Sequence, residues 1–119
     1  KRDFLYVTDV ANAFYLASIS KEVNSIYNIG AGEPKSINEL ANMIGGKIEY
    51  IPSRPGEPDI TWANISKISK TLNWIPKVKF ADGVNKMLDN IDLWKDAPLW
   101  DKRSINDATK VWFKYLDKK

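Results

Sequence analysis

The spacing of hydrophobic residues along this chain of 119 residues predicts five helices. In five stretches apolar residues recur every three or four positions, which is the period of one helical face. The clearest stretch opens at Ser36 with a capping box, because Glu39 stands three residues later, and it closes at Gly45. The predicted helices cover residues 10–17, 37–44, 65–72, 81–95 and 105–116.

Three short runs between these helices predict strands. The first two are apolar and partly aromatic, and the third alternates between polar and apolar residues. They are Phe4–Val7, Ile26–Ile29 and Lys47–Ile51. The segment Pro52–Pro58 holds three prolines and a glycine, so it predicts a loop. The sequence therefore predicts an α+β fold, with residues 1–119 as a single domain and residues 93–119 as a less typical helical tail.

Polar residues at the starts of the predicted helices are better explained as caps than as ligands. Thr8 or Asp9, Asn64 and Ser104 each stand just before a helical apolar pattern, where a side-chain oxygen can accept from an unpaired backbone N–H. The five tryptophans allow two interpretations: base stacking, or packing in a core or a domain interface. Their helical and strand-end positions favour packing. These residues are Trp62, Trp74, Trp94, Trp100 and Trp112.

Composition removes several classes of function. The chain has no cysteine and no histidine, which excludes disulfides, thiolate or imidazole metal sites and a Ser-His-Asp triad. Eighteen basic and fifteen acidic residues leave a net charge of only +3, without the basic face that nucleic-acid binding requires. No apolar run is long enough to span a membrane. We expect a cytoplasmic protein without metal, nucleic-acid or membrane partners.

Two arginines about fifty residues apart are the strongest candidates for a binding site. Arg2 precedes an acidic and aromatic segment, and Arg54 lies in the proline loop beside Gly56, which lets a ligand approach the backbone. A diphosphate needs converging cations, and the planar guanidinium fits phosphate oxygens. The alternative is that both are ordinary surface charges.

Four segments then resemble one enzyme family in order and spacing. They are Arg2-Asp3-Phe4-Leu5-Tyr6-Val7-Thr8-Asp9, Tyr27-Asn28-Ile29-Gly30, Arg54-Pro55-Gly56-Glu57, and the helix from Asn64 that ends in Asn73-Trp74-Ile75-Pro76. They resemble the C-terminal third of the extended short-chain dehydrogenases/reductases that act as nucleotide-sugar 4-epimerases and 4,6-dehydratases, closest in character to UDP-glucose 4-epimerase. The resemblance implies a small C-terminal substrate domain whose NAD-binding Rossmann domain is absent from this chain.

Two family signatures are accordingly not expected here. The segment Gly30-Ala31-Gly32 lacks the third glycine of a dinucleotide-binding loop, and Pro34 interrupts the approach to a helix. Tyr115 and Lys119 have the spacing of the family's catalytic pair, but they lie at the chain end instead of beside a nicotinamide. We therefore expect no catalytic residue and no NAD-binding residue in this chain.

The resemblance assigns substrate-binding roles to four residues. Arg2 and Arg54 would hold the diphosphate, and Glu57 would accept from a ribose hydroxyl, the alternative being a solvated loop carboxylate. Thr61 stands where some epimerases have a tyrosine facing the sugar. The implied function is C4 epimerisation through a transient 4-keto sugar. The alternatives are 4,6-dehydration, or a non-catalytic binding or interaction module. The intact enzyme would be a homodimer, and the isolated chain would be inactive.

Overall fold

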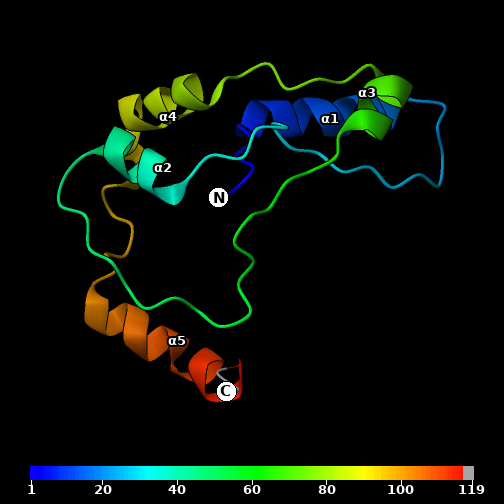
Figure 1. The fold of residues 1–119 in the computed structure, drawn as a ribbon. Coiled ribbons are helices and arrows are strands. Elements are labelled where there is room, and N and C mark those ends of the chain that lie inside the picture. The colour runs from blue at the N-terminus through cyan, green and yellow to red at the C-terminus, as the bar shows by residue number, and fades with distance from the viewer. Residues whose placement is uncertain (117–119) are drawn as a thin grey trace.

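Five α-helices and one 3₁₀ turn make up the regular structure of residues 1–116, which are the residues that the computed structural model describes. The helices are α1 (Val7–Ile19), α2 (Ile37–Ile44), α3 (Ser66–Leu72), α4 (Phe80–Asp89) and α5 (Lys102–Leu116), and the 3₁₀ turn is η1 (Ile91–Trp94). Figure 1 shows α1 beside α3, α2 beside α4, and α5 apart from these two pairs. The expectation of about five helices is confirmed.

The three predicted strands are wrong within the described residues. The runs Phe4–Val7, Ile26–Ile29 and Lys47–Ile51 form no ladder, and Val7 already begins α1. The single bridge among residues 1–116 pairs Arg2 with Lys35, whose backbone N–H and C=O groups exchange two hydrogen bonds of 2.9 Å. An apolar run becomes a strand only where a second strand accepts its backbone hydrogen bonds, and residues 1–116 supply none for these runs.

The hydrophobic core lies between α1 and α3. It consists of Ala13, Ile68, Leu72 and Trp74, and Leu5 and Tyr27 pack against it. Trp74 is the only one of the five tryptophans in this core, with 1% of its surface exposed. The other four are between 41% and 71% exposed, so within the described residues the core interpretation holds for one tryptophan alone.

The helix caps agree with the sequence at α2 and differ at α1, α3 and α5. Ser36 Oγ accepts from the Glu39 N–H at 2.9 Å. Asn64 Oδ1 accepts from the Ser66 N–H at 3.0 Å, but the N-cap of α3 is Ile65, so Asn64 stands one residue outside the cap. Asp9 is not a cap, because α1 begins at Val7 and the Asp9 carboxylate is buried. Ser104 lies inside α5, and the carboxylate that accepts from its N–H, at 2.7 Å, belongs to Asp101.

The long helix predicted over residues 81–95 ends earlier than its apolar pattern suggests. Helix α4 stops at Asp89, and the Asn90 side chain donates to the Lys86 carbonyl at 2.8 Å. The chain then continues as η1. A side chain that bonds to nearby backbone competes with helix continuation, which the apolar period alone does not show. None of the helices in the described part of the chain is long and apolar enough to cross a membrane.

Candidate functional site

Arg2 and Arg54 are brought together by one carboxylate, that of Glu57. Arg2 Nη2 donates to Glu57 Oε1 at 2.7 Å. Arg54 donates through Nε to Glu57 Oε2 at 2.9 Å and through Nη2 to Oε1 at 3.0 Å. The Arg54 contact is the planar two-bond arrangement that guanidinium and carboxylate groups favour. The two arginines and Glu57 are called the arginine pair site below.

Backbone hydrogen bonds fix the first two residues of the chain, and the Arg2 side chain contacts the proline loop. The Thr61 N–H donates to the Lys1 carbonyl at 3.2 Å, and the bridge to Lys35 fixes the next residue. Arg2 Nη1 also donates to the Pro58 carbonyl at 2.9 Å. Arg2 is therefore tied at both its backbone and its side chain.

A tight turn places Glu57 beside Arg54. The Glu57 N–H donates to the Arg54 carbonyl at 3.3 Å, and Gly56 has φ +75°, a conformation that residues with a Cβ rarely adopt. Pro55 fixes φ at the second position of the turn. The sequence Arg54-Pro55-Gly56-Glu57 therefore folds back on itself so that the arginine and the glutamate meet.

The site carries a net positive charge. Two guanidinium groups share one carboxylate, so one positive charge is not neutralised. The hydrogen bonds from Arg54, followed by those from Arg2, hold the pKa of Glu57 below its ordinary value of 4.5, so Glu57 is ionised at neutral pH. Among residues 1–116 no hydrogen-bond acceptor is found for Arg54 Nη1, so this group can donate to a further acceptor.

Helix α5 adds a residue that the sequence did not indicate. Trp112 Nε1 donates to the Pro55 carbonyl at 2.7 Å, and the Arg54 Cζ lies 5.5 Å from the centre of the Trp112 ring. The helical period of residues 105–116 placed Trp112 on an apolar face. No local signal linked that face to a loop more than fifty residues earlier.

Asp3 organises the backbone behind the arginine pair site. Its carboxylate accepts from the N–H groups of Ala31 at 2.8 Å, Gly32 at 3.3 Å and Ala63 at 3.0 Å. A Cβ at Gly30 would lie 2.4 Å from Asp3 Oδ2, so only glycine fits there. Arg2 thus belongs to the candidate site, whereas its neighbour Asp3 joins three segments of the chain.

Thr61 lies next to this site but does not contact it through its side chain in the described structure. It lines a polar hollow of about 460 Å³ with Asp3, Asn28 and Trp62. Its backbone connects it to Lys1, and so indirectly to Arg2. The structure therefore brings together three of the four predicted substrate residues, and the fourth borders an adjacent hollow.

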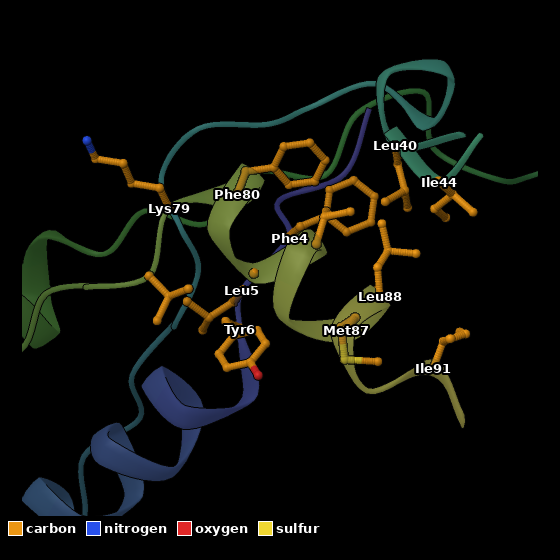
Figure 2. A pocket seen from close by; sticks show the side chains of 13 residues that line it. Phe4, Leu5, Tyr6, Leu40, Ile44, Lys79, Phe80, Met87, Leu88 and Ile91 are labelled. Atoms are coloured by element: carbon orange, nitrogen blue, oxygen red, sulfur yellow. The ribbon is translucent and has the colours of Figure 1, made fainter. Parts of the chain in front are cut away.

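A strongly apolar hollow lies elsewhere, between α2, α4 and the first residues of the chain. Figure 2 shows Leu40 and Ile44 of α2 facing Leu88 of α4, with Phe4 to one side of Leu40 and Leu88. Its volume is about 350 Å³. The Lys79 ammonium points away from it (Figure 2), so Lys79 does not supply this hollow with a cation.

Comparison with known proteins identifies the family. A family model described as GDP-mannose 4,6 dehydratase matches residues 1–87. The chain belongs to the extended short-chain dehydrogenase/reductase family of nucleotide-sugar epimerases and dehydratases. All four predicted substrate residues lie within the matched part of this family member, whereas Trp112 and the rest of α5 lie beyond it.

Relatives of this epimerase/dehydratase family member carry out both kinds of reaction. UDP-glucuronate 4-epimerase of Thermodesulfobacterium geofontis is 38% identical over 105 residues, which are 79% of this chain and 32% of that protein. The dTDP-D-glucose 4,6-dehydratase of Mus musculus is 29% identical over 114 residues, covering 82% of this chain and 32% of that protein.

A solved structure of UDP-glucuronic acid 4-epimerase from Bacillus cereus, in complex with UDP-glucuronic acid and NAD, is also similar. It superposes with a TM-score of 0.68 at 35% identity over 76% of this chain and 32% of that one. The chain therefore spans about a third of the length of the relatives that it matches.

Proposed function

We propose that this chain is the substrate-binding part of an NAD-dependent nucleotide-sugar 4-epimerase, in which Arg2 and Arg54 hold the diphosphate of the substrate. The observation that carries the proposal is the arginine pair site itself. Two guanidiniums from distant segments converge on one carboxylate and leave a net positive charge. The 38% identity to a UDP-glucuronate 4-epimerase supports the choice of substrate class and reaction.

The geometry suits a second anion beside Glu57. Each guanidinium has five N–H donors in a plane. Glu57 takes one from Arg2 and two from Arg54, and Arg2 Nη1 donates to the carbonyls of Lys1 and Pro58. A diphosphate would accept from the donors that remain, while Glu57 keeps both planes in place. Hydrogen bonds to charged groups contribute about 1.5–3 kcal/mol each. One arginine–phosphate contact is therefore enough to change substrate affinity by an order of magnitude.

The contribution of these residues to the reaction is orientation. An epimerase removes hydrogen from C4 of the bound hexose and returns it to the opposite face, so the sugar must turn while the nucleotide stays anchored. A diphosphate held between two arginines supplies that anchor. Glu57 would in addition accept from a ribose hydroxyl.

NAD supplies the acceptor for the C4 hydride in such an enzyme, but residues 1–116 do not form a cradle for it. After Gly30-Ala31-Gly32 the chain runs into the bridge between Lys35 and Arg2 and reaches α2 only at Ile37. No helix N-terminus therefore follows this turn directly, as a dinucleotide site requires. We assign NAD binding to the remainder of the protein and no step of the reaction to this turn.

A 4,6-dehydratase is the second candidate, because the family model and the mouse relative are described as dehydratases. Mass spectrometry of the product separates the two reactions. Epimerisation gives a product of unchanged mass, whereas dehydration removes one water. The complete protein would be incubated with UDP-glucuronate, and separately with dTDP-glucose, in the presence of NAD. A product of unchanged mass with a new chromatographic position supports epimerisation.

Removal of Arg54 tests the binding site directly. In the complete protein, Arg54→Ala and Arg2→Ala are each expected to raise the KM for the accepted substrate about tenfold or more. Arg103→Ala is the matched control, because Arg103 is the third arginine of the chain and lies exposed on α5. A KM within about twofold of the parent for Arg54→Ala would contradict the proposed diphosphate site.

A further inference from the structure

Helix α5 lies outside the part of the chain that matches the family model, yet it packs on the loop that carries Arg54. The match ends at residue 87, and α5 begins at Lys102. Ile105, Thr109 and Phe113 of α5 border a small hollow of about 130 Å³ together with Ile51 and Arg54. Figure 1 shows that α5 is remote from the other helices, so this loop is its main neighbour within the described chain.

Trp112 makes the two most specific contacts between α5 and this loop. Its indole N–H donates to the Pro55 carbonyl at 2.7 Å, and its ring lies under the Arg54 guanidinium, 5.5 Å from Cζ to the ring centre. Leu116 of α5 lies near the same turn, since a Cβ built on Gly56 would be 3.8 Å from its Cδ1. The turn that carries Arg54 is thus contacted by α5 at Arg54 and Pro55.

Together with Glu57, these contacts hold the Arg54 side chain from two sides. Glu57 takes the Nε and Nη2 edge of the Arg54 guanidinium, and the Trp112 ring covers one of its faces. The Nη1 group stays available. An arginine side chain loses considerable rotamer freedom when it binds a ligand, and a group that is already held loses less. Such an arrangement prepares the arginine for an anion at its open edge.

We propose that Trp112 is a positioning residue for Arg54, through which the C-terminal helix contributes to nucleotide diphosphate binding. The inference rests on the proposed function of Arg54. Trp112 is 41% exposed, so its position is not explained by burial in a core. Its hydrogen bond and its aromatic face both serve the arginine turn, and an indole provides both at once.

The test is a double-mutant cycle measured by calorimetric titration of the complete protein with UDP. Trp112→Ala is expected to weaken UDP binding about fivefold, which is the scale of one cation–aromatic contact together with one hydrogen bond. Trp112→Phe keeps an aromatic face but loses the N–H donor, so it should weaken binding about twofold. Trp94→Phe is the matched control, because Trp94 is exposed on η1 and should leave the affinity unchanged.

The cycle separates positioning from a general effect on folding. If Trp112 acts through Arg54, then Trp112→Ala added to Arg54→Ala causes no further loss of UDP affinity. An additive loss in the double variant would overturn the inference, and so would unchanged affinity in both Trp112 variants alongside weakened binding in Arg54→Ala. Unchanged affinity in Arg54→Ala would instead contradict the proposed function, so the two failures are distinct.

Discussion

The Trp74 indole N–H donates to the backbone carbonyl of Asp9 over 3.1 Å, and thereby joins two segments that are 65 residues apart. The Asp9 carboxylate completes the connection, because its Oδ2 accepts from the N–H groups of Lys77 at 3.0 Å and Val78 at 2.9 Å. One residue of α1 therefore fixes the segment that leads from α3 into α4. A buried carboxylate that accepts several backbone N–H groups has a structural task, and catalysis is not needed to explain it.

Loss of the Asp9 carboxylate should destabilise the fold. Asp9→Ala leaves two backbone N–H groups without their acceptor, and hydrogen bonds to charged groups contribute about 1.5–3 kcal/mol each. We expect the free energy of unfolding to fall by about 3 kcal/mol, and by less for Asp9→Asn, whose amide oxygen still accepts. Urea denaturation measures both. Asp107→Ala, at an exposed position of α5, should change stability by under about 0.5 kcal/mol, and an equal effect at both positions would contradict this assignment.

Substitution of Gly30 should be far more damaging than substitution of Gly45. An alanine Cβ at position 30 would lie 2.4 Å from Asp3 Oδ2 and 2.6 Å from Ala63 Cβ, so both neighbours would have to move. Gly45 has φ +82° and ψ −173°, a conformation almost confined to glycine, but nothing lies within 4 Å, so Gly45→Ala costs the backbone strain alone, about 1–3 kcal/mol. Thermal unfolding of the two variants tests this comparison. A Gly30→Ala protein as stable as Gly45→Ala would show that the Asp3 turn is not tightly packed.

The pH dependence of stability should report the arginine pair site. The pKa of Glu57 is held below its ordinary value of 4.5, chiefly by the hydrogen bonds from Arg54 and then by those from Arg2. A carboxyl group whose pKa is lowered on folding stabilises the fold above its unfolded pKa, and this contribution disappears as the pH falls through the folded value. Glu57→Gln should therefore be less stable than the parent at pH 7.

The difference between these two proteins should shrink below about pH 4.5. Urea denaturation of the parent and of Glu57→Gln between pH 7 and pH 3 measures it. Glu49→Gln is a suitable control, because Glu49 pairs only with the exposed Lys47. A constant difference across this range would mean that Glu57 ionisation is not coupled to folding.

The parts of this structure that could be predicted are the local ones. Helix α2 begins and ends where Ser36 and Gly45 indicated, since caps and apolar period are written in neighbouring residues. The strands could not be predicted, because a strand depends on a second segment, and Ile26–Ile29 has no ladder partner in the described residues. Asp9 was assigned to a helix cap because its neighbours in the sequence do not reveal a distant partner. Its true partners, Lys77 and Val78, lie nearly seventy residues away.

The candidate site, like the fold, could be predicted from the sequence only in part. The family resemblance identified Arg2 and Arg54 as partners, and they do lie together, although diphosphate binding stays a prediction. The carboxylate between them was expected to face a ribose, and its pairing with both guanidiniums could not be inferred from sequence. Trp112 had no signal at all, because its contact with Pro55 depends on how α5 returns to the proline loop.

The start of α5 offers a final test, because this helix carries Trp112. The Asp101 carboxylate accepts from the Ser104 N–H at 2.7 Å, and the Asp101 N–H donates to Ser104 Oγ at 2.9 Å, so the two residues cap the helix reciprocally. The Ser104 hydrogen bonds also lower the pKa of Asp101. Removing the carboxylate with Asp101→Ala leaves the first turn without its acceptor. We expect hydrogen exchange of the amides at 103–106 to accelerate about fivefold, while the amides of α1 keep their rates.

Because Trp112 lies two turns further along, loosening of the start of α5 should also weaken UDP binding slightly in the complete protein. Faster exchange at residue 112 than at residue 104 would show that α5 is held by its cap and not by the proline loop.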